Sequence, residues 1–375
     1  MEIFSQNTTT PLPVAVPAET KAAKRRSTRQ VKVGGITIGG NAPISVQTMT
    51  KTKTGDVAAT VAQIITAAEA GCDIVRVTVN DKEAAEAIAE IVRQSPIPVV
   101  ADIHFNHIFA LKAIQANVAK VRLNPGNIGT RERIHQVLHA AKDRGIPIRI
   151  GVNSGSLEED ILDKHGYPTA EALFESAMRH VGICDEAGFT DVIVSVKSTD
   201  VRLMIDAYRL VAQRTDIPLH LGVTEAGTTR VGTIKSAVGI GTLLAEGIGD
   251  TIRVSLTDEP VKEVEVGKEI LRTLGLATRN VELIACPTCG RLEVDLFGIM
   301  AELEKRLEGV KKPVKIAVLG CVVNGPGEAS EADIGIAAGK GVGILYRKGE
   351  VVRKVKESEI VDVIVEEVHR FQPEV

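Results

Sequence analysis

The sequence predicts a (β/α)8 barrel of the TIM type followed by a small α+β domain, and three observations support this. Between residues 31 and 277, a short β-branched run and a helical pattern alternate eight times, which is typical of a TIM barrel. After residue 281 the alternation stops, and strand and helix patterns follow in a different order. Aromatic residues make up 3% of the chain and Trp is absent. The core must therefore consist of Val, Ile, Leu and Ala, which suits parallel strands covered by helices.

Residues 1–30 are expected to form a disordered tail, because they are mostly polar, Pro and Ala and show no apolar pattern. They contain no apolar segment of the kind found in signal peptides. No stretch of about 18 apolar residues suggests a membrane span. We therefore expect a cytoplasmic protein without a membrane partner. The net charge of −3 provides no general attraction for nucleic acid.

The barrel strands are expected at residues 44–49, 72–79, 97–105, 119–125, 147–154, 191–197, 218–225 and 250–257. Intervening segments such as 57–71 and 131–145 carry apolar residues at helical spacing and end in Gly, which favours a helix C-terminus. A doubly wound open sheet is the alternative. It usually has fewer strands and a Gly-rich turn after the first strand, whereas the Gly-Gly pair at 39–40 precedes the first predicted strand.

The second domain is predicted to span residues 281–375, directly after a barrel domain at 31–277. Strands are expected at residues 281–287, 314–323, 332–339 and within 342–355. An amphipathic helix is predicted over residues 292–310, and a final helix over residues 360–371.

Polar residues recur near the C-terminal ends of the predicted barrel strands. Side chains alternate between the two faces of a strand, and the apolar face must meet the outer helices, so the polar face points into the barrel. Five cations share this inward orientation: Arg76, Arg122, Arg149, Lys197 and Arg253. Three further polar residues lie on the same faces: Asn124, Asn153 and Ser255.

Few carboxylates share this interior with the cations. Asp102, on the same face as His104, is the clear candidate, and Glu225 is the second. Since a buried charge is costly unless it is paired, a multiply charged anion such as a phosphate ester is expected to supply the missing partner. A buried ion network without a ligand is the alternative. The seventh run is less regular, because His220 and Glu225 differ by an odd number and cannot both face inward along one regular strand.

Three of the five cysteines lie near the C-terminus and form a metal-binding pattern. Cys286 and Cys289 form a Cys-x-x-Cys pair, and Cys321 follows 32 residues later. Three thiolates with an open fourth position favour a [4Fe–4S] cluster, and Glu328, beyond two glycines, could reach that position. A structural zinc site and reduced, unliganded thiols are the alternatives. Cys72 and Cys184 lie in apolar segments and are expected to pack in the core.

Ten segments of the chain together resemble the bacterial 4-hydroxy-3-methylbut-2-enyl diphosphate synthase family of the methylerythritol phosphate route to isoprenoids. They are PISVQTMT, AGCDIVRVTV, ADIHF, VRLNPGNIG, IRIGVNSGSLE, VSVKSTDV, HLGVTEAG, IRVSLT, CPTCGR and GCVVNGPGE, and they cover residues 32–340. The helix expected at 262–275 runs almost directly into residue 281, as in the two-domain bacterial members. Ala285 stands where many relatives have Ser.

The resemblance implies a reductive ring opening of 2-C-methyl-D-erythritol 2,4-cyclodiphosphate, fed by a flavodoxin or ferredoxin. It implies a [4Fe–4S] cluster held by Cys286, Cys289, Cys321 and Glu328. It also implies that Glu225 lies beside the reacting carbons and that diphosphate contacts come from Arg76, Arg122, Arg149, Asn153, Lys197, Arg253 and Ser255.

The predicted cysteines follow the eighth helix, whereas the anion site lies at the C-terminal mouth of the barrel. The resemblance implies a head-to-tail homodimer in which each cluster domain caps the other subunit's barrel. Two other functions are compatible with the residues. One is a non-redox barrel enzyme with a zinc domain and Lys197 as a Schiff-base lysine. The other is an iron–sulfur sensor that binds a phosphorylated metabolite.

Overall fold

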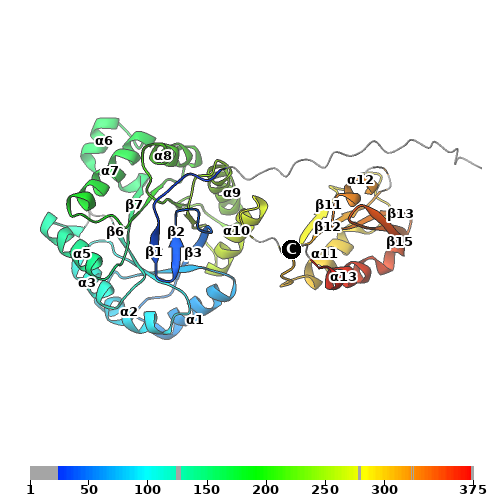
Figure 1. The fold of residues 1–375 in the computed structure, drawn as a ribbon, viewed down its shortest axis with the longest axis horizontal. Coiled ribbons are helices and arrows are strands. Elements are labelled where there is room, and N and C mark those ends of the chain that lie inside the picture. Colours follow the sequence, from blue (N-terminus) through cyan, green and yellow to red (C-terminus); the bar gives the residue numbers. More distant parts are fainter. Residues whose placement is uncertain (1–23, 124–127, 278–279, 322, 324, 373–375) are drawn as a thin grey trace, which may run out of the picture. The chain divides into compact units, whose positions relative to one another are not determined.

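The computed structural model describes residues 24–123, 128–277, 280–321, 323 and 325–372. The chain divides into two compact units, residues 1–270 and 271–375, of which the first is a barrel and the second a mixed sheet with helices (Figure 1). The boundary falls inside the last barrel helix, a few residues before the boundary expected from the sequence. Each unit is described by itself.

The barrel contains eight parallel strands in one sheet. Pairing runs β8-β7-β6-β5-β4-β3-β10-β9, and a parallel bridge between Val194 and Leu219 joins the two ends of this order. The strands are β3 (Ser45–Met49), β4 (Ile74–Thr78), β5 (Val99–Asp102), β6 (Lys120–Leu123), β7 (Ile148–Asn153), β8 (Val192–Lys197), β9 (His220–Leu221) and β10 (Thr251–Ile252). The predicted TIM barrel is therefore confirmed, although its seventh and eighth strands are only two residues long.

Helices follow the strands and form a ring around them (Figure 1). Several start at a side chain that accepts a hydrogen bond from the first helical turn, such as Asp56, Asp81 and Asp200, which compensates unpaired N–H groups. The helices are α1 (Val57–Glu69), α2 (Lys82–Gln94), α3 (His107–Gln115), α5 (Arg131–Asp143), α6 (Glu159–His165), α7 (Ala170–Glu186), α8 (Val201–Arg214), α9 (Thr229–Ala245) and α10 (Pro260–Thr273).

An N-terminal hairpin covers the end of the barrel at which the strands begin. Its strands β1 (Val31–Val33) and β2 (Ile36–Ile38) pair antiparallel, and the hairpin lies across the centre of the ring in Figure 1. Val31, Val33 and Ile38 form one buried cluster with Ile74, Val100 and Ile193 at the starts of three barrel strands. The sequence analysis did not identify this hairpin.

The prediction that residues 1–30 are disordered is wrong for residues 24–30. The Arg26 guanidinium donates hydrogen bonds to three backbone carbonyls, those of Ala212, Thr215 and Ile217. Arg29 also pairs with Asp216. The basic run lacks an apolar pattern, but it is held by carbonyl groups and carboxylates of the barrel. Residues 1–23 lie outside the described part of the chain.

The second unit is a five-stranded sheet with helices on both faces. Its strands, in the order β11-β12-β13-β14-β15, are β11 (Glu282–Ala285), β12 (Lys315–Leu319), β13 (Ile334–Gly339), β14 (Val342–Arg347) and β15 (Glu350–Lys356). The first three strands are parallel, and the last two add antiparallel. The helices are α11 (Leu296–Arg306), α12 (Gly325–Ser330) and α13 (Ile360–Arg370).

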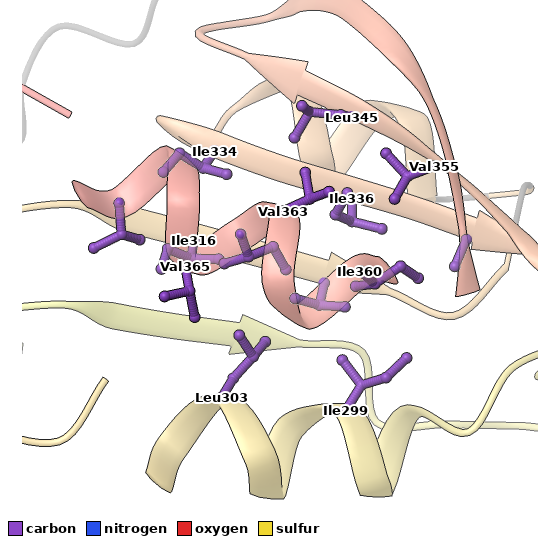
Figure 2. Packing of buried hydrophobic residues seen from close by; sticks show 14 of the residues in the cluster. Ile299, Leu303, Ile316, Ile334, Ile336, Leu345, Val355, Ile360, Val363 and Val365 are labelled. Carbon is purple, nitrogen blue, oxygen red and sulfur yellow. The ribbon is translucent and has the colours of Figure 1, made fainter. Parts of the chain in front are cut away.

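Alternating side chains of the sheet build two small cores in this unit. Ile316 and Ile336 point toward α11 and α13, where Leu303 and Ile360 meet them (Figure 2). The intervening residues, such as Leu319, pack with Ala329 of α12 on the opposite face. Because the parallel strands β11 and β12 are neighbours, their C-terminal ends meet at one edge of the sheet.

Candidate functional site

Strand register brings the predicted cations together inside the barrel. Asp102 of β5 is the register partner of Arg122 on β6, and Arg122 is the register partner of Arg149 on β7. Farther along, Asn153 pairs in register with Lys197. Side chains at equivalent positions of neighbouring strands point to the same side of the sheet. The five cations expected from strand alternation are accordingly buried or half-buried.

Asp102 is the shared counter-ion of two arginines and lies near a histidine. Its carboxylate lies 3.1 Å from Arg122 Nη1, 3.6 Å from Arg76 Nε and 3.8 Å from His104 Nε2. Burial opposes ionisation of this carboxyl, but Arg76 and Arg122 together outweigh it and lower its pKa to about 2. Asp102 therefore stays ionised. Its carboxylate already pairs with two arginines, so it can neutralise little of the charge of another cation.

The second carboxylate of the interior is Glu263 of α10. It is buried and lies 3.3 Å from Arg253 Nη2, and it accepts a hydrogen bond from Thr48 Oγ1 at 2.7 Å. The Leu256 N–H donates to it as well. Sequence reasoning missed Glu263, because a helix residue cannot be assigned to the barrel interior from strand alternation.

Glu225 does not take the place among the buried counter-ions that the sequence suggested. Strand β9 ends at Leu221, and Glu225 lies four residues later, exposed and with a positive φ of 49°. Within the described residues it forms no ion pair. His220, by contrast, is fully buried and is influenced by the charges of Arg149 and Lys197, so it is the member of this pair that faces the interior.

Of the five basic residues predicted to face the interior, Arg149 and Lys197 have no carboxylate partner in the part of the chain that the structure describes. Arg149 is 2% exposed and its Nε and Nη1 atoms have no hydrogen-bond partner. Burial, reinforced by the neighbouring arginines, holds the pKa of Lys197 well below its usual range. An anionic ligand would pair with Arg149 and favour the charged form of Lys197.

Two glycines create the space in which these cations lie. A Cβ atom on Gly222 would come within 2.6 Å of Lys197 Nζ, and one on Gly151 within 2.8 Å of Arg122 Nε. Side chains at these interior positions would displace the cations. The glycines therefore allow long side chains from neighbouring strands to extend across the barrel.

The remaining predicted contacts lie around this centre. His104 follows β5 and is half-buried, and Ser255 lies just after β10, also half-buried. Arg76 additionally contacts Met49 Sδ at 2.8 Å and 3.1 Å. Asn124 lies outside the described residues.

A polar layer deeper in the barrel was missed by the sequence analysis. Lys120 of β6 is 0% exposed and donates a hydrogen bond to Gln47 Oε1 at 3.4 Å. It precedes Arg122 by two residues and therefore shares its inward face. Strand alternation also predicts that Lys120 faces inward. Lys120 was missed because only residues near the C-terminal ends of the strands were predicted as site residues.

The three C-terminal cysteines follow two adjacent parallel strands of the second unit. Cys286 comes directly after β11 and Cys321 two residues after β12, and a Cβ on Gly320 would lie 3.8 Å from Cys286 Sγ. Cys289 is exposed, and hydrogen bonds from the Arg291 backbone and side chain lower its pKa. Glu328 lies in the first turn of α12 and is exposed.

Cys286 and Cys321 follow neighbouring strands of this sheet. In the described residues, no three His, Cys, Asp or Glu side chains converge closely enough to hold one metal ion. Thiolates and carboxylates are donors that an iron–sulfur cluster or a zinc ion can use.

Cys72 and Cys184 are buried, as expected for core residues. Burial raises the pKa of each thiol to about 12, which keeps both protonated and unreactive. Among the described residues, no helix is both long enough and apolar enough to cross a bilayer.

Comparison with known proteins gives matches along nearly the whole chain. The GcpE TIM-barrel domain model matches residues 28–268, and the GcpE protein C-terminal domain model matches residues 282–370. Three relatives carry the name 4-hydroxy-3-methylbut-2-en-1-yl diphosphate synthase (flavodoxin). The protein of Clostridium perfringens is 58% identical over 91% of this chain and 98% of its own length. Those of Geobacillus thermodenitrificans and Geobacter sulfurreducens are 57% and 55% identical, each over 93% of this chain and over 94% and 99% of their own lengths.

Proposed function

The chain belongs to the GcpE family of 4-hydroxy-3-methylbut-2-en-1-yl diphosphate synthases, and from this premise we propose how its residues perform the family's reaction. The protein is an oxidoreductase of isoprenoid precursor synthesis. It opens the ring of 2-C-methyl-D-erythritol 2,4-cyclodiphosphate reductively and forms 4-hydroxy-3-methylbut-2-enyl diphosphate.

The reaction consumes two electrons and one proton. A ring C–O bond breaks and its oxygen stays with the diphosphate, while the neighbouring hydroxyl group leaves with the proton as water and a C=C bond forms. The cyclic substrate carries two negative charges and the linear product carries a third. The site must therefore stabilise a strongly anionic group whose charge increases during the reaction.

The observation that carries the proposal is the surplus of cations in the barrel. Arg149 and Lys197 have no carboxylate partner in the described residues, and the diphosphate would supply it. Arg76, Arg122 and Arg253 already pair with Asp102 or Glu263, so they add hydrogen bonds and orientation more than net charge. Asn153, Ser255, His104 and Asn124 are proposed as polar contacts around the same anion.

Cys286, Cys289, Cys321 and Glu328 are proposed to hold a [4Fe–4S] cluster. When bound, such a cluster supplies low-potential electrons one at a time, which amino acid side chains do not provide. Arg291 stabilises the thiolate form of Cys289 that ligation requires. The carboxylate of Glu328, exposed on a short helix, is a weaker ligand than a thiolate and so the one most readily exchanged.

Glu225 is proposed to act as an acid or hydrogen-bonding group at the mouth of the barrel. Its exposed position after β9 and its positive φ support a role at the reacting carbons rather than in the buried ion network, because strained residues persist where function requires them.

A flavodoxin is the proposed electron donor, as the printed names of the relatives indicate. None of the five cysteines forms a disulfide, which supports a reducing, cytoplasmic location. We also propose that the protein forms a head-to-tail homodimer. Mixing inactive Lys197→Ala with inactive Cys321→Ala should restore part of the activity if the two half-sites come from different subunits, and no restoration after subunit exchange would contradict it.

The test of the function is anaerobic turnover of the cyclodiphosphate with a low-potential chemical reductant. Anaerobically purified protein should contain iron, absorb broadly in the visible range and form the linear diphosphate. Zinc in place of iron, together with no turnover, would favour a non-redox barrel enzyme. Iron and anion binding without turnover would favour a sensor.

A further inference from the structure

A fully buried lysine lies below the arginines that pair with Asp102. Lys120 is 0% exposed, and its amino nitrogen donates to Gln47 Oε1 at 3.4 Å. The Gln47 Nε2 atom and both ring nitrogens of the buried His220 have no hydrogen-bond partner. Lys120 forms no ion pair with any carboxylate of the described residues. This layer is polar, buried and incompletely satisfied, and it does not belong to the contacts discussed above.

The fixed charges around this layer do not cancel. Four arginines share the interior with only two carboxylates, Asp102 and Glu263. Arg keeps its proton in proteins, so these six groups leave two positive charges before any lysine is counted. Adding a charged lysine in this buried layer would increase an imbalance that is already costly. The groups that can lose or gain a proton in response to this positive charge are Lys120, Lys197 and His220.

We propose that Lys120 is a proton-linked anion-binding residue: it is a neutral amine in the empty barrel and takes up a proton when a dianion binds above it. The identity of that anion rests on the function proposed above, but the proton uptake does not. Lys120 would thus act on the anion at short range, from one layer below the arginines.

The physical basis is the opposing effect of the surroundings and of the ligand. Burial, followed by the charges of Arg149 and Arg76, holds the pKa of Lys120 well below its usual range. A bound dianion has the reverse effect, since it favours the charged form of a nearby amine. The charged groups that act on Lys120 are Arg149 of β7 and Arg76 of β4, and Lys120 in turn acts on His220 of β9. The other charged or titratable groups of the barrel interior are Asp102 of β5, Arg122 of β6, Lys197 of β8, Arg253 after β10 and Glu263 of α10.

The pH dependence of the anion affinity follows from the linkage between anion binding and proton binding. Between the pKa of Lys120 in the free protein and its higher pKa in the complex, binding takes up a proton. Affinity for the anion therefore falls as the pH rises through this window, by up to roughly tenfold per pH unit for one proton. Below the window the lysine is charged in both states, and above it the lysine is neutral in both.

The experiment is calorimetric titration of the oxidised holoenzyme with the cyclodiphosphate in the absence of reductant. The phosphate groups of this diester do not titrate near neutral pH, so uptake must come from the protein. Repeating the titration in buffers of different ionisation enthalpy gives the number of protons taken up. We expect on the order of one proton for the wild type, and no uptake in the wild type would overturn the proposal without any variant.

Two substitutions separate charge from packing. Lys120→Met removes the amine, and Lys120→Gln keeps a hydrogen-bonding group beside Gln47 but cannot be charged. Both should reduce the uptake and weaken binding by roughly tenfold to a hundredfold. The matched control is Lys112→Met on the outer face of α3, where the side chain is 38% exposed, and it should bind like the wild type. Unchanged uptake in a folded Lys120 variant would refute the assignment to this residue.

Failure of the inference can be told apart from failure of the proposed function. Sulfate, another dianion that does not titrate near neutral pH, is titrated in parallel, and turnover is measured on the same preparation. Uptake with sulfate but no turnover would support the inference and contradict the function. Turnover without uptake would support the function and contradict the inference.

Discussion

In the barrel, four of the predicted cations lie within paired strands, namely Arg76, Arg122, Arg149 and Lys197, whereas the cysteines of the second unit follow the last paired residue of each strand. Arg122 is fixed by register to both Asp102 and Arg149. Cys286 and Cys321 come after β11 and β12 have ended. Strand pairing therefore sets the positions of the barrel residues, although their unbalanced charges are costly. On the proposed function, the cysteine site would reach its final arrangement only with its ligand bound.

Removing a single thiolate should destroy the cysteine site and leave the barrel site intact. Cys321→Ala should abolish turnover and lose the iron, because the pattern supplies only three thiolates and the variant would keep two. Anion binding by the barrel should be unchanged. Iron analysis, the visible spectrum and calorimetric binding of the cyclodiphosphate measure these effects.

The control for this variant is Cys184→Ala, which removes a buried thiol of the barrel and should keep the iron and the activity. Loss of anion binding in Cys321→Ala would mean that the two sites do not assemble independently.

Removing the shared counter-ion should damage the barrel rather than the cluster. Asp102→Asn leaves Arg76 and Arg122 without a negative partner, and breaking a buried ion pair costs about 3–5 kcal/mol. Chemical denaturation should show a lower free energy of unfolding, and sulfate should recover more of it in the variant than in the wild type. If Asp102→Asn unfolded with the same free energy as the wild type in the absence of anions, the unpaired arginines would not destabilise the fold.

Acid should reproduce part of this effect in the wild type. The pKa of Asp102 is about 2 in the folded protein, below its value in the unfolded chain. Its contribution to stability is therefore complete above the unfolded pKa and is lost as the pH falls from about 4 to about 2. The expected loss is about 2 kcal/mol, read as the pH dependence of the unfolding free energy. Asp102→Asn should be flatter over this window.

A smaller change should affect the substrate and spare the fold. Gly151→Ala places a Cβ within 2.8 Å of Arg122 Nε, which is the end of a flexible side chain, so the arginine must move while the backbone can stay in place. We expect KM to rise about tenfold, which corresponds to the loss of one charged hydrogen bond. Gly182→Ala on α7, where a Cβ meets nothing within 4 Å, is the control and should keep the wild-type KM.

Strand alternation predicted the barrel and its inward cations because both follow from a period of two along each strand. It identified Arg149 and Lys197, and it would also have identified Lys120 if applied over the whole strand. It could not identify Glu263, which reaches the interior from a helix. It misplaced Glu225, because nothing in the run 218–225 showed that β9 would end after two residues.

Other features depended on long-range contacts that local patterns do not contain. Residues 24–30 are held by hydrogen bonds to backbone carbonyls near residues 212–217, and no sequence motif predicts these contacts. The cysteine spacing predicts a metal ligand set, because a Cys-x-x-Cys pair with a third cysteine is a metal-binding pattern. The spacing did not reveal that Cys286 and Cys321 follow adjacent strands.

The hairpin β1–β2 covers one end of the barrel. Val31, Val33 and Ile38 pack there in a buried apolar cluster with residues at the starts of three strands. An apolar layer is a poor path for a charged species. On the proposal made for Lys120, its proton would therefore arrive from the opposite end of the barrel, past the arginines, and a three-residue strand would determine the side from which the proton comes.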